Sequence, residues 1–172
     1  MISLLRTRRS VRKFTGQPVE PEKLDLLKEA ALRSPTSKNS NACEFIFIDN
    51  PAIIKILACC KPTGASPLLN APLVVVVLAS ESQTIAWVED CSIASIILQL
   101  TAHSLGLGSC WVQIRRRDYS EEKTSETFVR QTLNIPVGYR VLSCVAIGYS
   151  QRQPEGKPFG QLDFSKIHLN GL

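Results

Sequence analysis

The chain has few of the side chains on which metal and nucleophilic chemistry usually depend. It contains only two histidines, His103 and His168, and aromatic residues make up 6% of the sequence. A metal cluster or a Cys–His dyad would need these distant histidines to meet other ligands through the fold alone. We therefore predict no metal site. The low aromatic content also argues against a surface that stacks nucleic-acid bases.

The chain also lacks the common nucleotide-binding motifs. No P-loop is present, and Gly106-Leu107-Gly108 begins a dinucleotide fingerprint that is not completed, because position 111 is Trp. The surrounding pattern predicts a helix before these glycines and a strand after them. The fingerprint needs the reverse order, so that the pyrophosphate meets a helix N-terminus. A phosphate-bearing ligand would have to be held in another way.

The six cysteines form no CxxC pair, and no secretory signal is recognisable. We expect reduced thiols in a cytoplasmic protein, most of them structural, because free cysteines are usually buried. The cysteines are Cys43, Cys59, Cys60, Cys91, Cys110 and Cys144.

Positive charge is concentrated near the start of the chain. The formal net charge is +5, and five basic residues lie between Arg6 and Lys13. This charge favours anionic partners in general and selects none of them. One interpretation is a basic nucleic-acid-binding module, formed by this arm together with Arg115–Arg117, whose affinity would fall steeply with salt. The other interpretation is a phosphate-binding site.

The longest apolar segment is a predicted helix from Thr84 to about Ser104, which contains neither proline nor glycine. It is apolar nearly all round, and such a helix is expected to be buried nearly all round. A second copy of the chain could cover what one copy leaves exposed, through a two-fold interface. Charged and polar residues such as Glu89, Asp90 and Gln99 argue against a membrane span.

The length of 172 residues predicts a single domain, residues 1–172, with an irregular C-terminal tail over 150–172. Alternating helices and strands indicate an α/β or α+β sheet with helices on both faces. Leu4 and Leu5 of the first helix are expected to point inward. The predicted helices are Ile2–Thr7, Pro21–Leu32, Pro51–Leu57 and Tyr119–Leu133. The predicted strands are Glu44–Ile48, Leu73–Leu78, Ser109–Ile114 and Tyr139–Tyr149, with loops at Ser34–Ala42 and Lys61–Ala71.

Three segments offer complementary groups for one ligand. The arginines near the N-terminus supply forked, permanently charged donors suited to phosphate, and Ser10 adds a hydroxyl. The loop Ser34–Asn41 supplies uncharged polar groups suited to a polyol or to the edge of a heterocycle. The segment Gly106–Ile114 supplies accessible backbone. Together they describe a site for flavin mononucleotide (FMN), although each segment alone is also typical of a solvated basic face or an ordinary loop.

The order of these motifs resembles that of the FMN-dependent nitroreductase family. The matching stretches are RRSVR from Arg8, SPTSKNSNACEFIFI from Ser34, DCSIASIILQLTAHSLGLGSCW from Asp90, and a strand that ends in IGY before a Lys-Pro tail. The resemblance implies a nitroreductase-like α+β three-layer sandwich, in which a central mixed, mainly antiparallel sheet has helices on both faces. It also implies an intertwined homodimer.

The resemblance further implies an oxidoreductase in which NAD(P)H, as a transient donor, passes hydride to bound FMN. The electrons then go to a nitroaromatic, quinone or similar small acceptor by a ping-pong mechanism. Flavin N5 carries the chemistry, so no catalytic side chain is expected, and the protein positions and tunes the cofactor. A flavin carrier or sensor of the same fold without turnover stays an alternative. Neither a nucleic-acid nor a membrane partner is implied.

The resemblance assigns cofactor-binding residues by position. Arg8, Arg9 and Ser10 match phosphate and ribityl contacts, and Arg12 matches the basic residue at the N1 and O2 edge of the flavin. A cation there stabilises the negative charge that develops on the ring. Lys157 matches a phosphate-binding lysine of the tail.

The contacts with the ring are assigned to the polar loop and to the strand after the glycines. In the loop, Pro35, Thr36 and Ser37 match residues that lie against the ring, Asn39 matches the contact with the pyrimidine edge, and Asn41 stands where the family often has Gln. In the strand, the matching residues are Trp111, Val112 and Gln113, with the backbone N–H of Gln113 near flavin N5. The chain departs from the family at Ala42-Cys43, where Pro-Trp is common. Neither the acceptor nor the choice between NADH and NADPH follows from the sequence.

Overall fold

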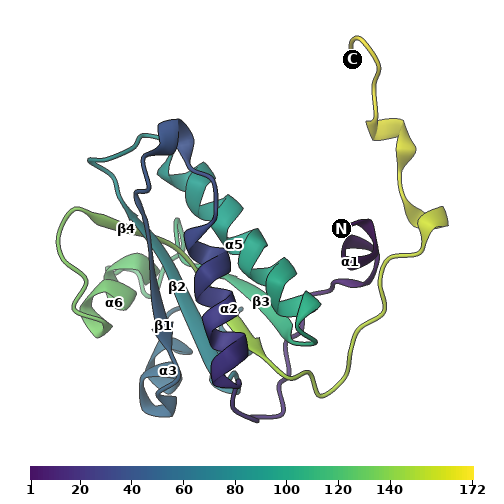
Figure 1. The fold of residues 1–172 in the computed structure, drawn as a ribbon. Helices are drawn as coiled ribbons and strands as arrows, with labels where there is room; N and C mark the ends of the chain where they lie inside the picture. The colour runs from purple at the N-terminus through teal and green to yellow at the C-terminus, as the bar shows by residue number, and fades with distance from the viewer.

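The framework of the computed structural model, which describes all residues 1–172, is one four-stranded sheet (Figure 1). The strands lie in the order β1-β2-β4-β3, and every ladder between neighbours is antiparallel. Helices cover both faces of the sheet, so the predicted α+β three-layer architecture is confirmed. The strands are β1 Cys43–Ile48, β2 Leu73–Ser80, β3 Gly108–Gln113 and β4 Tyr139–Gly148.

Strand β2 lies inside the sheet and is buried along its whole length, as its run of branched apolar residues predicts. Successive side chains of a strand point to opposite faces. Accordingly, Val74 and Val76 belong to one core layer, and Val75 and Val77 belong to the other. One continuous apolar strand therefore supplies side chains to two separate hydrophobic layers.

The helices divide between these two layers. On one face, α2 (Pro21–Leu32) and α5 (Trp87–Ser104) pack on the sheet, and on the other face lie α3 (Pro51–Leu57), α4 (Ser66–Leu69) and α6 (Ser125–Thr132). Helix α1 (Ile2–Thr7) stands apart from the sheet and contacts α5 (Figure 1). None of the helices combines the length and apolar composition that crossing a membrane requires.

Helix α5 is buried along one stripe and not nearly all round, so that prediction is wrong for a single chain. The buried stripe includes small side chains, such as Cys91, Ala94 and Ala102, which let the helix lie close to the sheet. The larger side chains of Ile93 and Ile96 point away and are 39% and 38% exposed. One chain therefore leaves an apolar strip of α5 uncovered.

Three local predictions also differ from the structure. Helix α6 begins at Ser125 and not near Tyr119, because the side chain of Thr124 accepts a hydrogen bond from the backbone N–H of Thr127 and caps the helix there. The side chain of Leu5 on α1 is 51% exposed and does not point into a core. The segment predicted as a loop over 61–71 contains α4, which has a proline in its first turn.

The segment after α1 is fixed between two parts of the sheet. Ser10 forms a parallel bridge with Ser109, and the backbone N–H of Val11 donates to the carbonyl of Ser109 at 2.8 Å. Further along, Thr15 N–H donates to the carbonyl of Tyr149 at 2.9 Å. The side chain of Phe14 is fully buried between these anchors. The basic residues of this segment are thereby held beside the free edge of β3.

The C-terminal tail passes α1 and then leaves the body of the protein (Figure 1). Gly156 packs so closely on the chain at Arg6 that a Cβ there would collide with the Arg6 carbonyl oxygen. Beyond it the only regular structure is two short 3-10 turns, Phe159–Gln161 and Phe164–Lys166. All side chains from 157 onward are exposed, including several large apolar ones.

We predict that Gly108→Ala destabilises the fold by about 1–3 kcal/mol, because overpacking a close contact forces side chains and backbone apart. A Cβ at Gly108 would lie 2.6–2.9 Å from the side-chain atoms of Val11. Urea unfolding of the two proteins measures the difference. Gly160→Ala is the matched control, since nothing lies within 4 Å of a Cβ there. If Gly108→Ala and wild type have equal free energies of unfolding, the side chain of Val11 does not pack on Gly108 as described.

Candidate functional site

The arginine-rich segment brings positive charge to the free edge of β3. Burial raises the pKa of the Cys110 thiol, and the charges of Arg12, Lys61 and Arg8 oppose that shift. Three cations from two separate parts of the chain, the segment after α1 and the region of Lys61, therefore act at one position of β3. Neither Arg8 nor Arg12 forms an ion pair within the chain, and the same holds for Arg9 and Lys157. Permanently charged groups without a carboxylate partner favour an anionic ligand.

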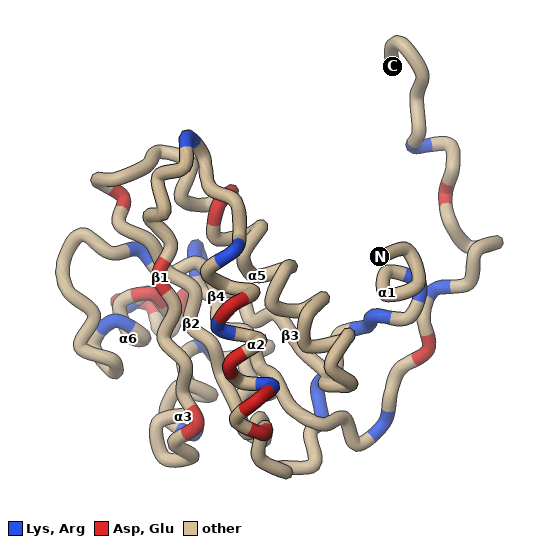
Figure 2. The backbone as a smooth tube through the Cα atoms, in the orientation of Figure 1, with Lys and Arg blue, Asp and Glu red and all other residues tan.

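Figure 2 shows where the basic residues lie along the course of the chain. Lys and Arg lie along the segment that follows α1 and along the first part of the tail, with little acidic charge between them. The tail contributes Lys157, which directly follows the close contact between Gly156 and Arg6. The predicted phosphate-binding residues from the two ends of the chain are thus brought together.

The free edge of β3 presents backbone groups beside these cations. The carbonyl of Ser109 accepts from Val11, and the carbonyl of Gln113 accepts from the Lys61 ammonium at 2.9 Å, so both point away from β4. Alternate residues of an antiparallel strand direct both N–H and C=O to the same side. The N–H groups of Trp111 and Gln113 therefore also point to this edge, beyond the part that Ser10 covers.

Side-chain contacts hold the end of β3 in place. The indole N–H of Trp111 donates to the Gln113 side-chain oxygen at 2.9 Å, and the Gln113 amide nitrogen donates to the carbonyl of Arg115 at 2.9 Å. The side chain of Val112 is buried in the core layer between the sheet and α3, α4 and α6, so only the backbone of this residue is available to a ligand. The predicted strand residues thus present a fixed row of backbone groups and no reactive side chain.

Lys61 is part of this site and was not predicted from the sequence. Burial lowers the pKa of its ammonium, and the hydrogen bond to the Gln113 carbonyl fixes the peptide that follows Gln113. In the sequence, Lys61 is only a lysine at the start of a Pro- and Gly-containing segment. No local pattern connects it with a strand 52 residues away.

The loop Ser34–Asn41 has a well-defined shape and is anchored on α5. The backbone N–H of Ser37 donates to the Asp90 carboxylate at 2.8 Å, and the N–H of Asn41 donates to the Thr36 hydroxyl at 3.0 Å. Lys38, Asn39 and Asn41 have positive φ angles of 50–54°, a conformation that Asn tolerates better than most residues. The anchoring carboxylate of Asp90 is itself 2% exposed.

The predicted ring-contacting side chains of the loop are available to a ligand. Pro35, Ser37 and Asn39 are exposed, and the side chains of Ser37 and Asn39 make no hydrogen bond within the chain. Asn41 donates from its side chain to the carbonyl of Asn39 at 3.1 Å. These contacts leave the hydroxyl of Ser37 and the amide of Asn39 free for a flat polar ring.

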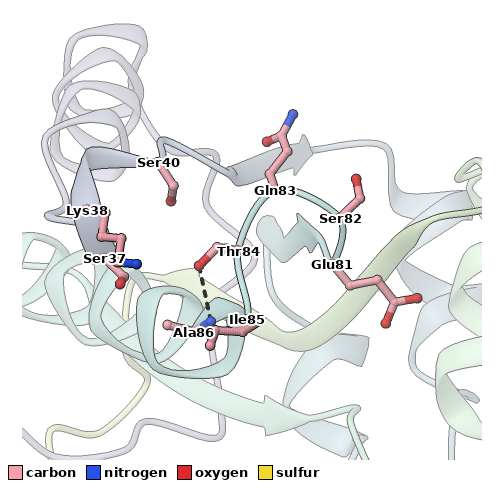
Figure 3. A pocket seen from close by; sticks show the side chains of 9 residues that line it. All are labelled: Ser37, Lys38, Ser40, Glu81, Ser82, Gln83, Thr84, Ile85 and Ala86. Atoms are coloured by element: carbon pink, nitrogen blue, oxygen red, sulfur yellow. Dashed lines mark hydrogen bonds between the residues drawn. The ribbon is translucent and has the colours of Figure 1, made fainter.

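A hollow of about 390 Å³ adjoins this loop (Figure 3). Ser37, Lys38 and Ser40 line one side, and residues 81–86 line the other, where the Thr84 hydroxyl accepts a hydrogen bond from Ala86 N–H at 3.1 Å. No arginine and no residue of β3 lines this hollow. Within one chain, the loop and the cationic edge of β3 do not share a cleft.

The length of α5 separates the two groups of predicted site residues. The Thr7 hydroxyl lies 2.7 Å from Nε2 of His103 near the C-terminal end of α5, whereas Ser37 is bound to Asp90 near its N-terminal end. These positions are roughly 20 Å apart along the helix axis. We call Arg8, Arg9, Ser10, Arg12, Trp111, Val112, Gln113 and Lys157 the cationic half-site. We call Pro35, Thr36, Ser37, Asn39 and Asn41 the loop half-site.

A three-layer sandwich with an antiparallel sheet, an arginine-rich segment beside the edge strand β3 and a polar loop agrees with the nitroreductase-like α+β architecture expected from the sequence. A sequence profile of the Nitroreductase family matches residues 5–61 and 60–149, and the chain belongs to that family. The resemblance found in the sequence motifs is thereby confirmed.

Individual relatives agree with this assignment. An FMN-dependent nitroreductase from Clostridium difficile R20291 is 40% identical, with a TM-score of 0.98 and 100% of each chain covered. A Methanothermobacter thermautotrophicus protein, provisionally named NADH dehydrogenase/NAD(P)H nitroreductase, is 31% identical over 98% of this chain and 86% of its own. The NADPH:FMN oxidoreductase of Vibrio harveyi, solved with NAD+, shares the fold at 21% identity and a TM-score of 0.83, over 99% of this chain and 77% of that one.

We predict that Asp90→Ala releases the loop from α5. A hydrogen bond to a charged group contributes about 1.5–3 kcal/mol, so amide exchange over residues 36–41 should become at least about tenfold faster. Hydrogen exchange followed by mass spectrometry measures this change. Asp90→Asn keeps an acceptor oxygen for Ser37 N–H and should show a much smaller effect. Unchanged exchange in Asp90→Ala would mean that the loop is held by other contacts.

Proposed function

We propose that the chain is an FMN-dependent oxidoreductase that takes hydride from NAD(P)H and passes it to a nitroaromatic, quinone or similar small acceptor. The FMN-dependent Clostridium difficile relative and the NAD(P)H nitroreductase relative support the cofactor, the donor and the enzyme class. The observation that carries the proposal is the cationic half-site, where unpaired arginines lie beside outward-facing amides of β3. The two substrates react in alternate half-reactions by a ping-pong mechanism.

The groups of the cationic half-site fit the phosphate and one edge of FMN. Arg8, Arg9 and Lys157 are free cations suited to a phosphate, and Ser10 adds a hydroxyl beside them. Arg12 supplies a permanent charge close to β3, where Gln113 offers its backbone N–H. The residues of the loop half-site carry no charge and suit the ring and its pyrimidine edge, and Lys38 is the only charged residue in the surrounding loop Ser34–Asn41. Each half-site thus matches a different part of one molecule.

A complete site requires two copies of the chain. In a two-fold dimer each contact occurs twice, so the cationic half-site of one copy can face the loop half-site of its partner at two places. The separation along α5 supports this arrangement, since neither half-site can reach the other within its own chain. The proposed dimer therefore holds two FMN molecules, each between two subunits.

Exposed apolar side chains support the same dimer. Ile93 and Ile96 on α5 form an uncovered strip, and Ile2 and Leu5 on α1 are more than half exposed. The tail carries further exposed apolar side chains that do not pack on the body of their own chain, namely Phe159, Leu162, Phe164, Ile167 and Leu169. A surface of this kind marks a protein interface. We infer that each tail lies on the partner subunit, which makes the dimer intertwined.

In the proposed mechanism, bound FMN supplies the hydride and electron chemistry, and the protein positions and stabilises it. Arg12 would supply a fixed positive charge that stabilises the negative charge developing on the reduced ring. The backbone N–H of Gln113 would be available to hold the ring, and the bond from Lys61 to the Gln113 carbonyl keeps this strand end in position. In this mechanism no side chain of either half-site transfers a proton.

We further propose that residues 1–172 act as one domain and that the protein is cytoplasmic. All six cysteines are free thiols, which fits a reducing compartment.

A flavin carrier or sensor without turnover differs from the proposed enzyme in one property. NAD(P)H would bleach the flavin absorbance of the enzyme and leave that of a carrier unchanged.

We predict that the purified protein is yellow and that Arg8→Ala/Arg12→Ala lowers its FMN affinity at least about a hundredfold. Each hydrogen bond between charged groups is worth about 1.5–3 kcal/mol, so two lost contacts should have this effect. Fluorescence titration with FMN measures the affinity. Lys28→Ala/Lys55→Ala removes the same charge far from β3 and should bind FMN like wild type. Full retention of FMN by the arginine variant would contradict the assignment of the cationic half-site.

We predict that Phe164→Asp/Ile167→Asp converts the dimer to a monomer and releases FMN in parallel. Each aspartate would place a charge in the apolar contact made by the tail, and burying an unpaired charge is strongly unfavourable. Sedimentation velocity and flavin absorbance, measured on the same samples, report the two properties. Ser165→Asp, between the two sites, is the control for the added charge. A folded monomer that keeps its flavin would contradict the composite site.

A further inference from the structure

Two cysteines from distant parts of the sequence meet directly beside the loop half-site. Sγ of Cys43, the first residue of β1, lies 3.7 Å from Sγ of Cys91 on α5. Cys43 immediately follows the loop and Ala42, and Cys91 immediately follows Asp90, which anchors the loop through Ser37. Each of the two cysteines is therefore adjacent to a residue that connects it with the loop: Ala42 for Cys43, and Asp90 for Cys91.

The two thiols differ in accessibility. Cys43 is partly exposed and lines a hollow of about 200 Å³ together with Thr36, Asn41 and Phe45. Cys91 is fully buried behind it in the core layer under α5. A small oxidant in the hollow would meet Cys43 first and could reach Cys91 only through Cys43.

The thiols also differ in acidity. A hydrogen bond from Cys91 lowers the pKa of the Cys43 thiol, against the opposing effects of burial and of the Asp90 charge. The same hydrogen bond, together with burial, raises the pKa of Cys91. The thiolate is the reactive form of cysteine, so Cys43 is suited to react first and Cys91 to resolve the product.

No other cysteine of the chain has this arrangement. Cys60, Cys110 and Cys144 are buried in the opposite core layer, and burial raises the pKa of each, for Cys60 to about 11. Cys59 is exposed and lies near the carbonyl of Lys55 without a thiol partner. The Cys43–Cys91 contact is the only hydrogen-bonded pair of thiols in the structure.

We propose that Cys43 and Cys91 form a reversible dithiol–disulfide pair that, when oxidised, links the start of β1, two residues after the loop half-site, to α5. With hydrogen peroxide as oxidant, the Cys43 thiolate attacks one peroxide oxygen, the O–O bond breaks, and Cys43 becomes a sulfenic acid. Hydroxide leaves and becomes water by taking up the proton that the Cys43 thiol had released. The Cys91 sulfur then attacks the sulfur of Cys43, the S–O bond breaks, and the hydroxyl group leaves as water with the proton of Cys91. Two thiols are oxidised to one disulfide, and hydrogen peroxide is reduced to two water molecules. An external dithiol reduces the disulfide to two thiols by donating two electrons and two protons, and is itself oxidised to a disulfide.

Oxidation would change the loop because the two sulfurs must approach. A disulfide has an S–S length of about 2.05 Å, so the sulfurs would move closer by roughly 1.7 Å from their present 3.7 Å. The start of β1, which directly follows the loop, would then be attached covalently to α5, and the loop itself would stay bound through Ser37 and Asp90. Opening of the loop away from α5 becomes restricted.

The test begins with the reduced wild-type protein, stripped of flavin and treated with hydrogen peroxide at increasing ratios. We expect the thiol count after denaturation to fall from six to four and peptide mapping without reductant to show a Cys43–Cys91 crosslink. Dithiothreitol should restore six thiols. In Cys91→Ala, dimedone should trap a sulfenic acid at Cys43, whereas the surface control Cys59→Ala should crosslink like wild type. A crosslink through other cysteines, or overoxidation of Cys43 in wild type without a disulfide, would overturn the proposal.

Hydrogen exchange of the loop tests the structural consequence. Amides of residues 36–41 should exchange roughly tenfold more slowly in the oxidised than in the reduced protein, and peroxide should leave them unchanged in Cys91→Ala. Equal amide exchange rates in the oxidised and reduced wild-type protein would contradict the proposed restriction of the loop by the disulfide. An effect of oxidation on FMN release rests on the proposed function, whereas crosslinking and exchange are both measured without flavin. Failure of flavin binding and failure of the thiol pair are therefore distinguishable.

Discussion

The path of α5 across the sheet is the constraint on which the rest of the structure depends. Its N-terminal end holds the polar loop through Asp90, and its C-terminal end holds α1 through the contact between His103 and Thr7. Because an 18-residue helix is rigid and roughly 27 Å long, these attachments keep the two half-sites apart in every chain. The same helix leaves Ile93 and Ile96 exposed on a single chain. The separation of the half-sites and the apolar strip of the proposed dimer interface thus have one structural cause.

The cationic half-site depends on a close contact between backbone segments. Val11 packs on Gly108, where any side chain would collide with it, and the backbone N–H of Val11 donates to the carbonyl of Ser109. This contact fixes several like charges beside one strand edge, although they repel one another and have no carboxylate partner. The repulsion opposes folding of the free chain and is relieved when an anion binds. A phosphate-bearing cofactor should therefore stabilise both the segment and the site.

Much of the fold and of the site chemistry could be predicted from the sequence, because the relevant signals are local. Each of these signals lies within one continuous stretch of sequence. They are the run of branched apolar residues in β2, the proline-free segment of α5 and the cluster of arginines. The roles of Lys61 and Asp90 could not be predicted, since their partners, Gln113 and Ser37, lie 52 and 53 residues away and are brought together only by the fold. The inward orientation expected for Leu5 was wrong because its apolar surface is not covered by its own chain. Likewise, the sequence indicates that three segments bind one ligand, but it does not say which of them meet within one copy of the chain. The structure shows that one chain keeps the loop apart from the cationic edge of β3.

The most direct test of the composite site mixes two defective chains. One chain carries Arg8→Ala/Arg12→Ala in the cationic half-site, and the other carries Ser37→Ala/Asn39→Ala in the loop half-site; each forms an FMN-deficient homodimer. Heterodimers are isolated with two affinity tags, and their FMN content is measured by absorbance. If each site combines half-sites from both subunits, one site of the heterodimer has both defects and the other has none, so about half of the wild-type FMN content returns. If each site lies within one chain, both sites of the heterodimer stay defective and no FMN returns, which would contradict the account.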